Sequence, residues 1–219
     1  MLVMGLDTAL QRCSVAILSN GAVLADVSSA MERGHAEHLA PMAANALRQA
    51  GARVRDLGRV GVVVGPGGFT GVRVGLSFVR GLGVGTGIEI VGVTSLAALA
   101  ANIAPDTDLI APVIDARRGQ VYAAVYDTCG SVIVPPFVAA PADAKKKIDA
   151  VKEARMVTFA GSGAPLIDPS LSGEAEIDAK AVARLAAAAS APSAPPAPLY
   201  LRAPDAKPGR PSVFQPVSS

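Results

Sequence analysis

Two aspartates stand at the ends of similar apolar runs in this sequence. Asp7 closes the run at residues 2–6, and Asp115 closes the run at residues 109–114. A carboxylate at the end of a buried strand can hold a metal ion through water when the hairpin that follows offers bare backbone N–H groups to phosphate. The pair therefore raises the question of a phosphate or metal site.

The residues that follow both aspartates oppose such a site. Residues 8–11 contain no glycine, and Arg117 and Arg118 come soon after Asp115. Side chains at these positions obstruct the path along which bare backbone would wrap phosphate. We expect Asp7 and Asp115 to accept hydrogen bonds from local backbone donors at the strand ends. The alternative is a nucleotide or metal contact made by Asp7, Asp115 and Arg118.

A second candidate for chemistry is the glycine-rich loop at residues 65–75. A Walker A loop needs Gly-Lys-Ser/Thr, but Val72 follows Gly71, and the dinucleotide fingerprint needs a glycine where Thr70 stands. Such a loop also lets backbone pack closely on a helix or on another chain, and this is the interpretation that we favour. The loop residues are Gly65, Pro66, Gly67, Gly68 and Gly71.

The two histidines, His35 and His38, are spaced for one face at the start of a helix and could ligate a metal. The one nearby third ligand, Glu37, would point elsewhere on that helix. Because Pro41 indicates that regular helix begins only about there, the pair is better explained by the helix entry or by exposure.

Composition indicates a well-buried α/β protein. Of the 219 residues, 51% are hydrophobic and 17% are charged, and the formal net charge is +2. This charge is too small to argue for nucleic-acid binding by electrostatics alone. No apolar run reaches the length of a transmembrane helix, and the first residues lack the basic start of a signal peptide. We expect a cytoplasmic protein with no membrane partner.

The elements that must position these residues occur in a pattern that repeats. The first copy reads as three strands, a helix, a strand and a helix, with one more strand and a short helix after it. Asn20-Gly21 is a strong two-residue hairpin signal between the second and third strands. The expected ranges are residues 2–6, 13–18, 23–28, 39–50, 60–64, 72–83, 88–93 and 95–101, with Ser95 as the cap of the last helix.

The second copy is shorter. Its strands are expected at residues 109–114, 120–126, 132–134 and 157–160, and its helices at 145–154 and 178–189, with Asp178 as a cap. Two βββαβα copies, each opening with a strand that ends in aspartate, indicate tandem ribonuclease-H-like lobes, the α/β fold of the actin-like (ASKHA) superfamily. We expect lobes at residues 1–103 and 104–202, and a disordered tail at 203–219, where prolines and small polar residues dominate.

Five segments resemble the bacterial TsaB (YeaZ) family. They are the opening at residues 6–8, the His-Ala-Glu-His-Leu segment at 35–39, the glycine loop at 65–75, the strand at 115–122 and the Pro-Leu-Tyr-Leu-Arg segment at 198–202. The similarity extends over nearly all of the chain up to Arg202. The chain departs from the family at Gly68, where serine is usual, and at Ser162, where aspartate is frequent.

The resemblance implies an accessory protein and not an enzyme. Members of this family partner a TsaD-type catalytic subunit and a TsaE-type ATPase, which place a threonylcarbamoyl group on the adenosine beside the anticodon of transfer RNA (t6A). It further implies that transfer RNA is reached only through the complex and that this chain binds no cofactor tightly. ATP or ADP and magnesium would belong to the assembled complex, and a homodimer is expected when the partner is absent.

A free-standing enzyme of the same fold is the competing interpretation. A small-molecule kinase would need the glycine hairpins that are missing after Asp7 and Asp115. A glycoprotease-like enzyme would need a nucleophile with its base, or a metal site, and no such spacing stands out.

We expect the partner surface on two neighbouring helices of the first lobe. One helix carries a stripe of Leu, Met and Ala, and the other begins with glycines four apart that would leave a groove for a partner helix. The alternative is that these positions face the chain's own sheet. The expected interface residues are Leu39, Met42, Ala46, Phe69, Thr70, Val72, Arg73, Gly75 and Leu76.

Overall fold

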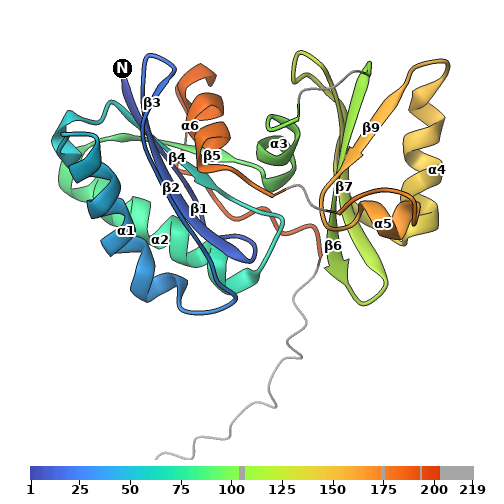
Figure 1. The fold of residues 1–219 in the computed structure, drawn as a ribbon, viewed down its shortest axis with the longest axis horizontal. Helices are drawn as coiled ribbons and strands as arrows, with labels where there is room; N and C mark the ends of the chain where they lie inside the picture. The colour runs from blue at the N-terminus through green and yellow to red at the C-terminus, as the bar shows by residue number, and fades with distance from the viewer. Residues whose placement is uncertain (104–106, 174–175, 193, 203–219) are drawn as a thin grey trace, which may run out of the picture.

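Each half of the chain builds an antiparallel three-stranded meander to which parallel strands are added, as the repeat predicts. The computed structural model describes residues 1–103, 107–173, 176–192 and 194–202. Its two sheets form two lobes that lie side by side (Figure 1). The fold is therefore the two-lobed ASKHA type.

The first lobe has a five-stranded sheet in the order β3-β2-β1-β4-β5. Strands β1, β2 and β3 are antiparallel neighbours, whereas β4 and β5 run parallel to β1. Helices α1 and α2 pack on one face of this sheet. The bounds are β1 Leu2–Asp7, β2 Arg12–Ser19, β3 Ala22–Ala30, α1 His35–Gln49, η1 Val54–Asp56, β4 Arg59–Val63, α2 Phe69–Thr86, β5 Glu89–Val93 and α3 Ser95–Ala100.

The second lobe has a four-stranded sheet in the order β8-β7-β6-β9, so it lacks a counterpart of β5. Helix α3, which ends the first copy, packs against β6 and β7 and joins the two cores. The bounds are β6 Leu109–Arg117, β7 Gln120–Asp127, β8 Val132–Ala139, α4 Pro141–Lys152, β9 Val157–Ala160, α5 Ala164–Ile167 and α6 Ala179–Ala188.

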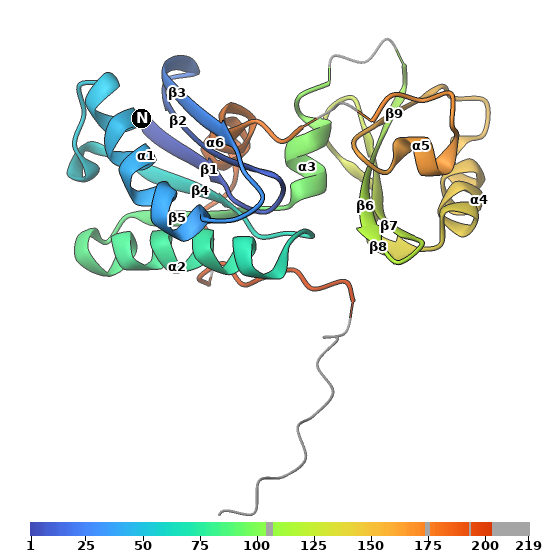
Figure 2. The same cartoon turned by 60° about the horizontal axis from the view of Figure 1, so that its bottom comes forward.

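Helix α6 packs on the first sheet, although it belongs to the second copy in the sequence. It contacts β1, β2, β4 and β5 on the face opposite α2 (Figure 2). The sheet offers glycines at the contact, and a β-carbon on Gly61 would lie 2.7 Å from the Ala186 methyl group. Close approach of an alanine face to glycines brings this helix onto the strands. Helix α6 lies within the expected second lobe at residues 104–202 but packs on the sheet of the first lobe, so the expected boundary does not describe this helix.

Two local expectations need correction, and a third is not tested. Helix α1 begins at His35 and contains Pro41, so regular helix starts before the proline and not at it. The side chain that caps α3 is Thr94, which accepts a hydrogen bond from the Ala97 N–H, and not Ser95. The tail expected at residues 203–219 lies outside the described residues.

Candidate functional site

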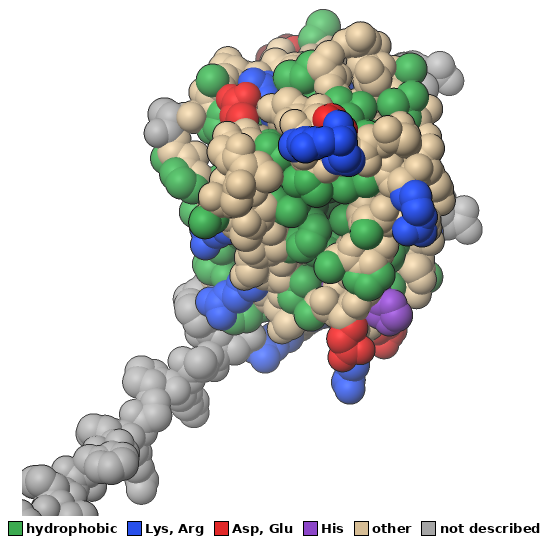
Figure 3. All heavy atoms as spheres, turned by 90° about the vertical axis from the view of Figure 1, so that its left-hand side faces the viewer, with side chains coloured by type: hydrophobic (Ala, Val, Ile, Leu, Met, Phe, Trp, Pro, Cys, Tyr) green, Lys and Arg blue, Asp and Glu red, His purple; other side chains and the backbone are tan. Residues whose placement is uncertain are grey.

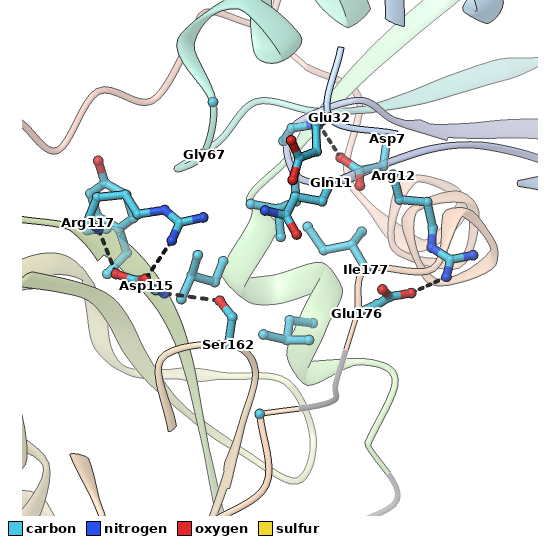
Figure 4. Close-up of a pocket in the computed structure, with 18 of the residues that line it drawn as sticks. Asp7, Gln11, Arg12, Glu32, Gly67, Asp115, Arg117, Ser162, Glu176 and Ile177 are labelled. Atoms are coloured by element: carbon cyan, nitrogen blue, oxygen red, sulfur yellow. Dashed lines mark hydrogen bonds and ion pairs between the residues drawn. The ribbon is translucent and has the colours of Figure 1, made fainter. Parts of the chain in front are cut away.

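A cleft of about 770 Å³ lies between the lobes, and it is lined by Asp7 at the end of β1 and Asp115 near the end of β6 (Figure 4). Both aspartates line it, together with loops from each lobe. Neither His35 nor His38 is among its lining residues. The other polar lining residues are Gln11, Arg12, Glu32, Arg33, Arg117, Tyr122, Ser162 and Glu176.

Asp7 is buried at the end of β1, with 1% of its surface exposed. Its Oδ1 atom accepts a hydrogen bond from the Ala9 N–H at 2.8 Å, which is the local role expected for it. Among the described residues, Oδ2 has no hydrogen-bond partner. Burial raises the pKa of this carboxyl to about 7, against the opposing effects of the Ala9 and Thr8 N–H groups and of Arg12.

Thr8 and Ala9, which follow Asp7, pack closely into the glycine loop. The Thr8 hydroxyl donates to the Gly71 carbonyl at 2.8 Å, and the Gly68 N–H donates to the Ala9 carbonyl at 2.7 Å. A β-carbon at Gly71 would collide with the Thr8 carbonyl oxygen, and one at Gly75 would lie 2.7 Å from the Thr8 hydroxyl. The expectation of close packing is therefore correct, but the packed segment is the chain's own loop and not a partner helix. The Gly68 N–H is likewise used internally and not offered to phosphate.

The second aspartate is held in a similar local way. Asp115 accepts a hydrogen bond from the Arg117 N–H at 2.7 Å and pairs with the Arg117 guanidinium at 3.3 Å. Its own N–H donates to the Ser162 hydroxyl at 3.1 Å. Arg117 and Arg118 adopt left-handed φ angles of 62° and 55° in the turn between β6 and β7. Arg118 does not line the cleft, so the expected trio of Asp7, Asp115 and Arg118 is not brought together there.

The remaining charges in the cleft are paired across its walls or lie exposed. Arg12 from β2 forms an ion pair with Glu176, which precedes α6 (Figure 4). Within the described ranges, no group of three or more His, Cys, Asp or Glu side chains is placed to hold a metal ion. His35 is buried while His38 is exposed, so the two histidines do not face one site.

The expected partner surface is only partly available. Leu39 and Ala46 on α1, and Val72 and Leu76 on α2, are at most 2% exposed and belong to the first core. Gly75 is buried as well. The alternative that these positions face the chain's own sheet is correct for these five residues, because the four side chains lie in the first core and a β-carbon on Gly75 would meet Val62 and Leu6 of the sheet. Of the remaining four, Met42 is half-buried, and Phe69, Thr70 and Arg73 are exposed.

Apolar side chains nevertheless gather on the outer side of the two helices. Figure 3 shows this side of the first lobe, with hydrophobic side chains at its centre and charged ones around them. Met42 of α1, and Val74 and Phe78 of α2, pack against the core and stay partly exposed. We call these three residues the outer helical face. The sequence reasoning missed Val74 and Phe78, although their i, i+4 spacing was a signal for a common face.

Tyr200 was also missed as a site residue. Its ring stacks on Phe69 with centroids 5.2 Å apart, and its hydroxyl accepts a hydrogen bond from Arg73 Nε at 2.9 Å. The contact joins positions 127 residues apart, so no local pattern could reveal it.

The chain is similar in sequence to proteins of transfer-RNA modification. A family model described as TsaD, tRNA N6-adenosine threonylcarbamoyltransferase, matches residues 23–206. The tRNA threonylcarbamoyladenosine biosynthesis proteins TsaB of Bacillus subtilis and Escherichia coli are each 34% identical, over 126 and 128 residues. Each match covers 58% of this chain and 55% of the relative, so the chain matches only about half the length of these relatives.

Other matches span nearly the whole chain. An uncharacterized protein of Mycobacterium tuberculosis is 34% identical over 219 residues, which cover 94% of both chains. A crystal structure of a Pseudomonas aeruginosa protein with similarity to peptidase YeaZ superposes with a TM-score of 0.80 and 28% identity, covering 92% of this chain and 99% of that one. The structure of YeaZ from Pseudomonas aeruginosa superposes with a TM-score of 0.70 and 26% identity, covering 85% and 90%. Separately, no helix among the described residues is long and apolar enough to cross a membrane.

Proposed function

This chain belongs to the TsaB (YeaZ) family, and on that premise we propose that it is a non-catalytic accessory subunit in the biosynthesis of threonylcarbamoyladenosine. In this role it binds and activates a TsaD-type catalytic subunit in the cytoplasm, together with a TsaE-type ATPase. The non-catalytic role is supported by the glycine loop, because Thr8 and Ala9 pack into it and occupy the space that a phosphate would need.

The outer helical face supports a protein partner. Apolar side chains that pack on the core and remain partly exposed lose further surface when a second apolar face covers them. Met42, Val74 and Phe78 lie on two adjacent helices, which together present half of a helix bundle. A catalytic subunit of related fold would complete this bundle, and a second copy of this chain would do so more weakly when the partner is absent.

The test of the role is co-purification with the TsaD-type subunit of the same organism, followed by reconstitution of threonylcarbamoyladenosine formation. The wild-type chain is expected to form a complex and to raise the rate of modification. Absence of any complex on size-exclusion chromatography would remove the proposed role.

The test of the surface uses Met42→Glu and Phe78→Glu, with Val132→Glu as the control. Val132 is 55% exposed on β8 in the second lobe, so the control adds the same charge away from the helices. We expect both helix variants to stay folded by circular dichroism and to lose the complex, while the control keeps it. A folded Phe78→Glu chain that still binds its partner would refute this surface but not the role. Val72→Glu is unsuitable because that side chain is 2% exposed in the core.

The isolated chain is expected to release no phosphate from ATP in the presence of magnesium. The control is the double variant Asp7→Ala, Asp115→Ala, which removes both candidate metal-contacting carboxylates. Release by the wild-type chain above this control would favour the competing kinase interpretation.

A further inference from the structure

A strap formed by residues 194–202 runs across the first lobe beside α2 and ends at the second lobe (Figure 2). The Leu199 N–H donates to the Val64 carbonyl at 2.8 Å, which fixes the strap at the start of the glycine loop. Arg80 of α2 donates to the Pro196 carbonyl at 2.8 Å. Arg202 donates to the Gln120 side chain and to the Arg117 carbonyl in the β6–β7 turn.

The strap and α2 together build an exposed aromatic platform. The rings of Phe69 and Tyr200 stack at an interplanar angle of 28°, and the Arg73 guanidinium lies 3.5 Å from the centre of the Phe69 ring. Phe69 is 47% exposed and Tyr200 is 45% exposed. Arg73 and Tyr200 cover part of the Phe69 ring, and the exposed remainder of the two rings offers surface on which another π-system can stack.

The charge along this edge is positive. In the part of the chain that the structure describes, Arg73, Arg80 and Arg202 make their hydrogen bonds to carbonyl, hydroxyl or amide oxygens and form no ion pair with a carboxylate. The whole chain carries 20 basic and 18 acidic residues, so this edge is a local excess that the net charge of +2 does not reveal.

We propose that this edge, formed by Phe69, Arg73, Arg80, Tyr200 and Arg202, binds single-stranded RNA. Bases stack on the aromatic platform, and the arginines meet the phosphates on either side of it. The six residue steps from Pro196 to Arg202 span at most about 20 Å, which suits a short unpaired segment and not a long duplex. The positive charge and the half-exposed rings distinguish the edge from the apolar outer helical face, which fits a protein.

RNA binding at this edge goes beyond the accessory role and does not depend on it, since it is a property of the isolated chain. Direct RNA binding by this chain differs from the earlier expectation that it contacts transfer RNA only through the complex.

The experiment measures fluorescence anisotropy of a labelled 12-nucleotide single-stranded RNA with the full chain, over a series of salt concentrations. Tyr200→Ala and Phe69→Ala are each expected to weaken binding about tenfold, which is within the range for loss of one stacked base. Arg80→Ala is expected to lower the slope of log affinity against log salt by about 0.7. Tyr200→Phe keeps the ring and loses only the hydroxyl bond to Arg73, so it is expected to bind nearly as well as the wild type.

The matched control is Lys146→Ala on α4, where an exposed lysine is removed from the other lobe. It is expected to leave affinity unchanged. Equal affinity of the wild type, Tyr200→Ala and Arg80→Ala chains would overturn the proposal, as would equal binding of a duplex of the same sequence. Variants of the edge residues that still bind RNA but no longer bind the catalytic subunit would also overturn it, because the edge would then be a protein contact. Conversely, RNA binding by a chain that forms no such complex supports this proposal while the accessory role fails.

Discussion

At the scale of single residues, Asp7 shows how a carboxyl can line a cleft and still be almost completely buried. One oxygen is used by the Ala9 N–H, and the other is enclosed without a partner among the described residues. Burial disfavours the charged form, and its effect on the pKa exceeds the opposing effects of the N–H groups and of Arg12. The unusual pKa of Asp7 therefore has a structural cause and does not by itself indicate a catalytic acid.

The raised pKa of Asp7 predicts a stability that falls as pH rises. Because the folded-state pKa of about 7 lies above the ordinary value of 3.8, the native chain binds the extra proton between these two values. The free energy of unfolding should thus decrease by about 1.4 kcal/mol for each pH unit between about pH 4 and pH 7, and then level off. Asp7→Asn should lose this decrease and be more stable than the wild type at pH 8. Urea unfolding at pH 5 and pH 8 measures both, and an unchanged pH dependence in the variant would contradict the argument.

Arg59 gives a second residue-scale prediction. Its guanidinium pairs with Glu89 at 2.6 Å and donates to the Ala186 and Ala189 carbonyls at 2.8 and 2.7 Å, so it closes the C-terminal end of α6. Arg59→Met should cost about 3 kcal/mol, because it leaves these acceptors unsatisfied. Arg53→Met, which breaks an exposed pair with Asp56, should cost less than about 1 kcal/mol. Similar losses in the two urea titrations would refute this role for Arg59.

At the scale of elements, the glycines of α2 differ in what they face. A β-carbon at Gly71 would collide with the Thr8 carbonyl, whereas one at Gly81 meets nothing within 4 Å. Gly71→Ala should therefore destabilise the protein by about 2–3 kcal/mol, because the loop after β1 must move away. Gly81→Ala should stabilise it by up to about 1 kcal/mol through helix propensity alone. Thermal melting of the two variants gives the comparison, and equal shifts of the same sign would show that the loop does not pack on α2 as described.

Elements whose signals are local could be predicted from the sequence. Asn20 and Gly21 have φ angles of 47° and 87° in the expected hairpin turn, and the Asp178 side chain accepts the expected bond from the Lys180 N–H. Contacts between distant segments could not be predicted in this way. The Thr8–Gly71 hydrogen bond joins residues 63 positions apart, and the periodicity of α6 does not say which sheet it covers. The prediction of a groove for a partner helix was wrong for this reason. In the sequence, an apolar stripe and a pair of glycines look the same whether they pack against the chain itself or against a partner.

At the scale of the whole molecule, two segments from the end of the chain tie the lobes together. Helix α6 crosses from the second copy onto the first sheet, and the strap then passes the glycine loop and returns to the β6–β7 turn. The strap shields Val64 and Gly92, where a β-carbon on Gly92 would lie 2.9 Å from Pro196. The chain therefore needs its residues up to Arg202 for the first lobe as well as for the second.

Two truncations test this dependence. A chain that ends at residue 195 loses the Leu199–Val64 and Arg80–Pro196 hydrogen bonds and the Tyr200 stack, so its free energy of unfolding should fall by roughly 2–4 kcal/mol. A chain that ends at residue 202 keeps all three contacts and should melt at the same temperature as the full chain. This expectation rests on composition alone, since a segment of prolines and small polar residues such as 203–219 is not expected to offset an ordering entropy of about 1–2 kcal/mol per residue. Hydrogen exchange adds a local measure, because the Leu199 amide should be protected in both longer chains. Equal melting of all three chains would show that the lobes do not require the strap. Strong protection across residues 203–219 would contradict the expectation for the tail.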